Sequence, residues 1–207
     1  MNREQRISRE LPARSKTDGV LDSLHPGRMN DVGTRPELGR DIDCGCESFT
    51  FQDLPRRKGL RPATLRGPLH IQCNGHGHPQ YLDELTTAAL SWPYVETEVP
   101  DSRSSNIIPL RLQENAAGYN FAAFISPKEF GRVLTGTPTI YSALPLVCAH
   151  WAIVRGWAEP HYLSSHGLMP PGALVVYTPR DQHELSICHS FFLAAYTAAS
   201  KPVSSEQ

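Results

Sequence analysis

The sequence predicts an α+β fold, an antiparallel sheet with helices packed mainly on one face. The chain has 207 residues, of which 40% are hydrophobic and 20% charged, as in an ordinary globular domain. Short apolar segments bounded by Pro, Gly and Asn predict strands, and longer segments with helical spacing predict helices. These strands and helices do not alternate strictly, which favours α+β over a parallel sheet.

The first 53 residues predict a largely irregular, mobile N-terminal tail. Phe49 is the first aromatic residue, and residues 1–40 mix acidic and basic side chains with Ser, Gly and Pro without an apolar period. Such a segment buries too little surface to offset its ordering entropy. We therefore expect one domain over residues 54–200 and a C-terminal tail over residues 201–207.

The first half of the domain predicts one helix among several strands. Residues 69–73 alternate weakly and end at Asn74-Gly75, which predicts a short strand and a turn. Pro79 begins a helix that Pro93 ends, with an apolar face. Three further strands are predicted over residues 94–99, 107–112 and 119–125, and the loop 114–118 makes the last two a hairpin.

The second half predicts three helices and two strands, the first of them a short strand that contains Tyr141. Ser126 as N-cap and Pro127 predict a short helix through Leu134. Residues 145–155 predict an apolar helix that ends at Gly156. A buried strand over 174–177 precedes the last helix, for which Thr178 is the N-cap. That helix runs to about residue 198 with an apolar stripe, made of Leu185, Cys188, Phe192 and Tyr196.

Composition excludes several functional classes. The formal net charge is −1, which gives no electrostatic footprint for nucleic acid or an anionic membrane. No apolar run reaches the roughly 18 residues of a membrane span. The five cysteines are odd in number and irregularly spaced, and no signal peptide is evident, which favours reduced thiols and a cytoplasmic location. Cys44-Gly-Cys46 lacks the two-residue spacer of the usual zinc and redox motifs.

Two motifs in the C-terminal third carry a resemblance to a known family. They are Gly156-Trp-Ala-Glu-Pro-His161 and Val175-Val-Tyr-Thr-Pro-Arg-Asp181, followed by Glu184-Leu185. The chain resembles the luciferase-domain family, which includes fungal luciferases and many uncharacterised proteins. The segment 54–62 also resembles the fungal members, so that the resemblance covers roughly residues 54–198.

The resemblance implies a compact α+β domain and, as in fungal luciferases, a cofactor-free oxygenase that adds O₂ to a hydroxypyrone and expels CO₂. Such chemistry needs a base, donors for enolate and peroxide charge, and an apolar pocket. Arg132 and Tyr141 align with positions where family members usually carry histidines. This departure makes rearrangement, cyclisation or dehydration at least an equal alternative to oxygenation.

The predicted catalytic residues are His161, Tyr141, Arg132 and Glu159. His161 is interpreted as an acid/base projecting from a rigid loop with a pKa near neutrality, or as a loop-fixing histidine. Glu159 orients it or is a solvated carboxylate. Arg132 is an anion-stabilising donor or an exposed helix-surface arginine. Tyr141 donates to a substrate carbonyl or is an ordinary core tyrosine.

The predicted substrate-binding residues are Arg180, Trp157, Trp151, His166 and Tyr177. Arg180, in the first turn of the last helix, clamps a substrate oxygen or pairs with Asp181 or Glu184. The two tryptophans pack the core or line a pocket, and His166 belongs to a candidate lid loop. His70, His76 and His78 lack a characteristic partner spacing for a metal, so no metal is predicted.

These observations predict a small cofactor-independent enzyme that acts on a polyketide- or pyrone-like metabolite by acid–base chemistry. No nucleotide-binding motif is present in the sequence. The expected partners are a small-molecule substrate, with O₂ in the oxygenase version, and a homodimer is compatible with the chain. The alternative is a non-catalytic domain that binds a small molecule or a partner and has lost the family's histidines.

Overall fold

The computed structural model describes residues 51–97, 106–114, 116 and 123–200. Cys44, Cys46, most of the predicted 119–125 strand and the predicted tails, apart from residues 51–53, lie outside the described residues. The described chain begins with a 3-10 helix, η2 (Phe51–Asp53), whose Phe51 packs against Phe191 in the core at a ring distance of 5.7 Å. No helix in this described part is long and apolar enough to cross a membrane.

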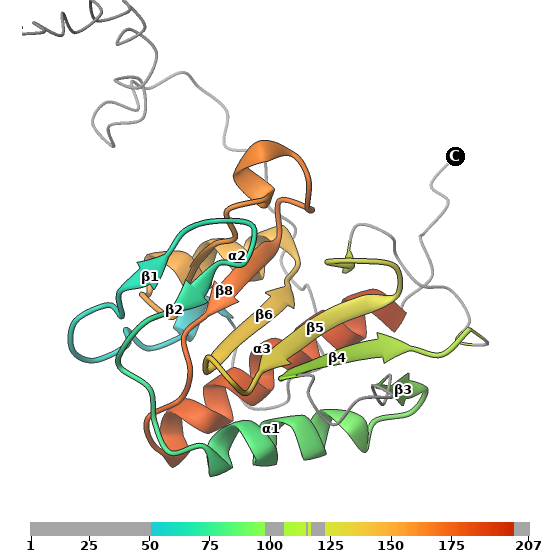
Figure 1. Cartoon of the computed structure of the whole chain (residues 1–207), viewed down its shortest axis with the longest axis horizontal. Helices are drawn as coiled ribbons and strands as arrows, with labels where there is room; N and C mark the ends of the chain where they lie inside the picture. Colours follow the sequence, from blue (N-terminus) through green and yellow to red (C-terminus); the bar gives the residue numbers. More distant parts are fainter. Residues whose placement is uncertain (1–50, 98–105, 115, 117–122, 201–207) are drawn as a thin grey trace, which may run out of the picture. The chain divides into compact units, whose positions relative to one another are not determined.

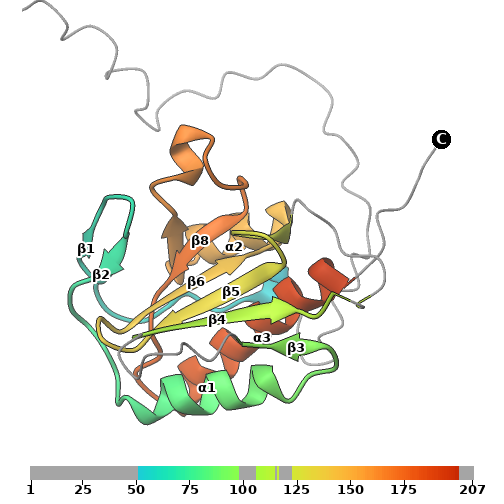
Figure 2. The same cartoon turned by 45° about the vertical axis from the view of Figure 1, so that its right-hand side comes forward.

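The sheet has six antiparallel strands in the order β3-β4-β5-β6-β8-β7. Figure 1 labels β3 to β6 and β8 among them. Their bounds are β3 Val95–Glu96, β4 Ile107–Leu112, β5 Glu129–Leu134, β6 Thr139–Ala143, β7 Ala158–Pro160 and β8 Ala173–Val176. A separate two-stranded hairpin, β1 (Thr64–Leu65) and β2 (Ile71–Gln72), stands beside the sheet in both views (Figure 1 and Figure 2).

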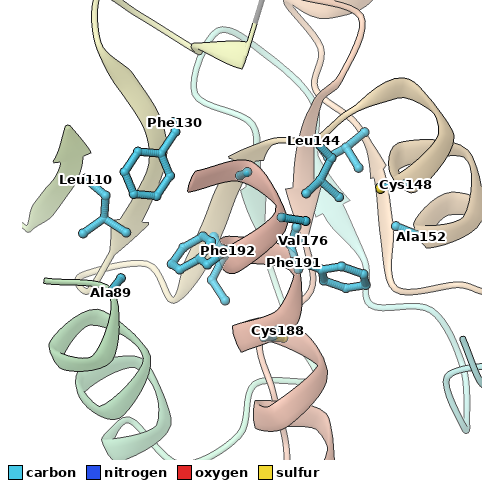
Figure 3. Close-up of a cluster of buried hydrophobic side chains, with 14 of the residues drawn as sticks. Ala89, Leu110, Phe130, Leu144, Cys148, Ala152, Val176, Cys188, Phe191 and Phe192 are labelled. Atoms are coloured by element: carbon cyan, nitrogen blue, oxygen red, sulfur yellow. The ribbon is translucent and has the colours of Figure 1, made fainter. Parts of the chain in front are cut away.

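The helices α1 (Gln80–Leu90), α2 (Leu146–Val154) and α3 (Gln182–Ser200) bury their apolar residues in one core on one face of the sheet. Figure 3 shows side chains from all three helices meeting strand residues in this core. In α1 the buried positions are Leu82, Leu85, Thr86 and Ala89, which follow the helical period. The predicted α+β architecture with helices on one face is therefore confirmed.

The predicted helix over 127–134 is wrong, because this segment is strand β5 in the middle of the sheet. Ser126 does not cap a helix; its hydroxyl donates to the Glu129 carboxylate at 2.5 Å. Lys128 has φ +63°, which turns the chain into the strand. Pairing on both sides with β4 and β6 outweighs the local helix-start signal.

The last helix begins later than predicted. Its N-cap is Asp181, whose Oδ1 accepts the backbone N–H of Glu184 at 2.8 Å, and not Thr178. The predicted apolar stripe on this helix is confirmed for Leu185, Cys188 and Phe192, which are buried. Gly156 ends α2 as predicted, with φ +83°.

Candidate functional site

Strand register places three of the predicted catalytic residues in one row across the sheet. Arg132 on β5 pairs with Tyr141 on β6, Tyr141 pairs with Val175 on β8, and Val175 pairs with Glu159 on β7. Directly opposite residues in antiparallel strands share a face. Tyr141 and Val175 belong to a small apolar cluster separate from the helix-side core, so the row lies on the face opposite the helices.

Two segments cover this face. The hairpin supplies Ile71, and the loop between β7 and β8, which contains η4 (Ser164–His166), supplies Met169; both pack on the small cluster. The hairpin is fixed by Gln72, whose backbone N–H donates to Thr139 Oγ1 at 3.0 Å and whose Oε1 accepts the Thr178 N–H at 2.9 Å. We name His70, Arg132, Tyr141, Glu159 and His161 the sheet-face cluster.

His161 is completely buried, which overturns the prediction of an imidazole that points out of the loop. Its ring centroid lies 4.8 Å from that of Tyr141 and 5.6 Å from that of His70. Nδ1 accepts the backbone N–H of Leu163 at 3.2 Å, so the neutral ring carries its proton on Nε2. Nε2 is buried and has no hydrogen-bond partner among the described residues.

The pKa of His161 also differs from the prediction of a near-neutral value. Burial, with smaller contributions from the charges of His70 and Arg132, lowers this pKa to about 4. The imidazole is therefore neutral at pH 7 and presents an N–H, because its other nitrogen is occupied. The geometry favours a hydrogen-bond donor over a general base.

Tyr141 presents a second buried donor beside His161. Its hydroxyl is buried and has no hydrogen-bond partner of normal geometry among the described residues. Burial raises the pKa of Tyr141 to about 12, against the opposing effects of the Arg132 charge and the backbone of His70. The phenol thus stays protonated at neutral pH.

Glu159 is held in a network that sequence reasoning missed. Its Oε1 lies 2.7 Å from His70 Nε2 and accepts the Thr64 hydroxyl at 2.6 Å, and its Oε2 accepts the Tyr177 hydroxyl at 3.0 Å. Burial alone raises the pKa of Glu159, but the contacts with His70, Thr64 and Tyr177 lower it to about 2. The solvated-carboxylate interpretation is therefore wrong, since its side chain is 12% exposed and its oxygens are occupied.

His70 is the residue of the cluster that the sequence did not assign. Its Nδ1 accepts the backbone N–H of Tyr162 at 3.1 Å, so its Nε2 faces Glu159 as a donor. The available signal was the alternation of the short strand at 69–73. The metal interpretation had grouped it with His76 and His78, which lie elsewhere: His78 Nδ1 accepts the Gln80 N–H at 3.3 Å.

Arg132 forms an ion pair with the buried carboxylate of Glu129. Glu129 is completely buried and accepts Arg132 Nη2 at 2.9 Å, and this contact, against burial, raises the pKa of Arg132. Arg132 is a partly exposed strand residue, so the helix-surface interpretation is wrong. Its charge acts on Tyr141 and His161 while it remains paired with Glu129.

The structure does not bring the predicted substrate-binding residues to this cluster, with the exception of Tyr177. Trp157 lies in the helix-side core and donates its Nε1 proton to Pro55 O at 2.6 Å. Trp151 packs on the same core from α2. Arg180 forms an ion pair with Glu184, the predicted structural alternative. His166 is exposed, and its Nδ1 lies 2.8 Å from Tyr162 O.

Two cavities are described, and neither is lined by a residue of the sheet-face cluster. A groove of about 600 Å³ runs between α1 and α3 and includes Leu85, Ala88, Leu185 and Ile187 in its lining. A smaller pocket of about 150 Å³ lies between the segment 56–61 and the end of α2. No group of three or more His, Cys, Asp or Glu side chains is arranged to hold a metal ion in the part of the chain that the structure describes.

No family model, curated protein or solved structure matches the chain.

Proposed function

We propose that this protein is a small cofactor-independent enzyme that acts on a polyketide- or pyrone-like molecule through the sheet-face cluster. One observation carries the proposal: His161 Nε2 and the Tyr141 hydroxyl are buried on rings that contact each other at 4.8 Å, and neither makes a hydrogen bond of standard geometry among the described residues. An unsatisfied buried polar group costs about 1–3 kcal/mol. Two such groups side by side are typical of a site that is completed by a ligand acceptor.

The donor pair is suited to the oxygen of an enolate. Each group presents one proton at neutral pH. His161, with a pKa of about 4, is a neutral imidazole that keeps its Nε2–H, and Tyr141, with a pKa of about 12, keeps its O–H. Buried donors that are fixed before substrate binds stabilise developing negative charge without reorganisation. Arg132 adds positive potential on the same face. This arrangement serves O₂ addition, cyclisation and dehydration alike, since each proceeds through an enolate.

Glu159 and His70 act as positioning residues in this proposal. The pKa of Glu159, at about 2, makes it a weak base, and its oxygens accept the Thr64 and Tyr177 hydroxyls while Oε1 lies 2.7 Å from His70 Nε2. Its role is to fix His70, whose ring faces His161. A hydroxypyrone is acidic enough to bind as its enolate, so the site supplies donors and needs no strong base.

Substrate entry requires the loop over residues 162–172 to move. Backbone N–H groups of Tyr162 and Leu163 bind His70 and His161, and Met169 packs on the small apolar cluster. The loop therefore closes the cluster in this structure. Most of its side chains are partly or fully exposed, as expected of a segment that opens at low cost.

The experiment is turnover of a panel of hydroxy-2-pyrones and linear polyketones, followed by mass spectrometry and an oxygen electrode. We expect Tyr141→Phe and His161→Gln each to lower kcat by about 10²-fold or more, as for loss of an oxyanion donor. His150→Gln, on the exposed surface of α2, is the control and keeps wild-type turnover. Oxygen consumption identifies an oxygenase. Turnover unaffected by both cluster variants rules the proposal out.

The groove between α1 and α3 favours a second candidate, a non-catalytic small-molecule binding domain. Its volume of about 600 Å³ is that of a typical ligand site, and it has an apolar floor. Ala88→Trp fills the groove from α1. The binding domain is supported if an apolar ligand binds saturably, Ala88→Trp abolishes this binding and Tyr141→Phe leaves it intact. The enzyme is supported if Tyr141→Phe abolishes binding and Ala88→Trp leaves it intact.

We also place the protein in the cytoplasm as part of this proposal. Cys73 and Cys188 are free thiols, and Cys188 is buried in the helix-side core. Free thiols are typical of a reducing compartment. Electrophoresis of protein alkylated at cell lysis tests this expectation.

A further inference from the structure

The pocket beside the end of α2 is lined by four arginines and no acidic residue. Arg56, Arg57 and Arg61 come from the segment before β1, and Arg155 follows α2 directly. Gly59, Leu60, Val154 and Gly156 complete the lining. Like charges this close repel one another unless an anion sits among them.

Arg57 is the buried member of this group. Its side chain is 3% exposed, and its guanidinium stacks on Trp157 and Tyr177 at 5.8 and 5.5 Å. Nη2 donates to Thr178 O and Glu184 Oε2, both at 2.9 Å, whereas Nε and Nη1 are buried without a hydrogen-bond partner among the described residues. A buried, charged donor with two unused N–H directions indicates a missing acceptor.

Carboxylates do not balance the remaining charge. Glu184 is shared, because Arg180 binds the same carboxylate as Arg57. Arg61 Nη2 donates to Ile153 O and Arg155 Nη2 to Gln52 O, at 2.9 and 3.2 Å. Neither has an ion pair with a carboxylate among the described residues, and Arg155 Nε is buried without a partner there.

The carbonyl groups at the C-terminal end of α2 do not neutralise the charge in the pocket either. Its terminal carbonyls are already used, since Ile153 O accepts Arg61 and Arg155 O accepts the backbone N–H of Arg57 at 2.9 Å. Gly156, with φ +83°, keeps the turn free of a side chain beside Arg61. The pocket therefore presents guanidinium groups and little competing negative charge.

We propose that this pocket binds a phosphate monoester group. About 150 Å³ accommodates one tetrahedral oxyanion with some water and is too small for a nucleotide base. Guanidinium forks bind phosphate oxygens in pairs, which selects this group over chloride. Leu60, 93% exposed at the rim, leaves room for the organic part of the ester outside the pocket.

Calorimetric titration of the full chain with inorganic phosphate and with glycerol phosphate tests the proposal. We expect saturable binding that Arg61→Gln and Arg155→Gln each weaken about tenfold or more, as for loss of a charge-assisted hydrogen bond. Lys58→Gln removes one charge from the same segment but not from the pocket lining, and is expected to change affinity less than twofold. Arg57 is not substituted, because its loss would leave buried Glu184 with one cation fewer.

A vesicle arm distinguishes the two sources of such an ester. The ester is a lipid headgroup if the protein sediments with phosphatidate vesicles but not with phosphatidylglycerol vesicles, and if Arg61→Gln abolishes this sedimentation. Phosphate binding without vesicle binding identifies a small metabolite. Absence of saturable phosphate binding, or equal losses in Lys58→Gln and Arg61→Gln, overturns the proposal.

Discussion

The two faces of the six-stranded sheet are built from the same strands but from different chemistry. The helix face is a continuous apolar core in which Leu110, Phe130, Val176, Phe191 and Phe192 are completely buried. The opposite face has a small apolar cluster around a row of buried polar side chains. Helices seal the first, whereas a hairpin and a loop cover the second.

Stability and ligand binding depend on different faces of the sheet. Burial of apolar area stabilises a domain without directional requirements, so the helix face needs only close packing. The polar face carries donors without partners among the described residues, which lower stability unless a ligand satisfies them. A region that is destabilised in this way is a candidate site. The apolar burial on the helix face offsets the free energy that this region costs.

The largest expected effect is the loss of an aromatic side chain from the helix face. Phe191 is completely buried and contacts the rings of Phe51 and Trp157 at 5.7 and 6.4 Å. We expect Phe191→Ala to lower the free energy of unfolding by about 3–5 kcal/mol in urea denaturation. Leu60→Ala, at a 93% exposed position, is the control and stays within about 0.5 kcal/mol. A loss below about 1 kcal/mol for Phe191→Ala contradicts the assignment of stability to this face.

A smaller effect is expected from acid on the polar face. The pKa of His161 is about 4 in the folded protein, whereas its ordinary value is 6.5. The unfolded chain therefore takes up this proton first, so the contribution is fully present above pH 6.5 and is lost as the pH falls to about 4. The difference in unfolding free energy is on the order of 3 kcal/mol.

His161→Gln removes this proton uptake and isolates its contribution. Urea denaturation at pH 7.5 and pH 4 should show a smaller acid-induced loss of stability in this variant than in the wild type. His150→Gln, on the exposed surface of α2, should keep the wild-type loss. Glu159, whose pKa of about 2 lies below the ordinary value of 4.5, contributes in a lower window, from about pH 4.5 to 2. Equal acid losses in His161→Gln and the wild type show that the imidazole is not buried as described.

Local patterns predicted the helix face well, because that face depends on periodicity. The spacing of Leu82, Leu85 and Ala89 and the stripe along α3 identified the buried sides of two helices. Strand β5 could not be identified, because Ser126-Pro127 is a strong local helix-start signal and pairing with β4 and β6 lies far along the chain. Strand β7 is too short to show alternation and ends at Pro160.

The polar face was predicted as separate residues but not as an arrangement. The sequence singled out Arg132, Tyr141, Glu159 and His161, whereas only the register of β5, β6, β8 and β7 shows that they share one face. His70 was missed because its partners are far along the chain; Tyr162, for example, lies 92 residues after it. Burial of His161 depends on the same long-range contacts.

The smallest expected change in stability separates the two faces most sharply. Ser142 on β6 is the neighbour of Tyr141 and points to the helix side, since it pairs with Gly131 and Leu174. Its hydroxyl, like that of Tyr141, is buried and makes no hydrogen bond of standard geometry among the described residues. Tyr141→Phe and Ser142→Ala thus each remove one unsatisfied hydroxyl, one from each face. Because each substitution removes a desolvation penalty, the free energy of unfolding of both variants should equal that of the wild type or exceed it by up to about 1 kcal/mol. Only Tyr141→Phe should lower turnover or ligand affinity, because only its hydroxyl belongs to the proposed donor pair. A stability loss above 1 kcal/mol in Tyr141→Phe shows that the hydroxyl has a partner in the folded protein, and the polar face is then a second structural core.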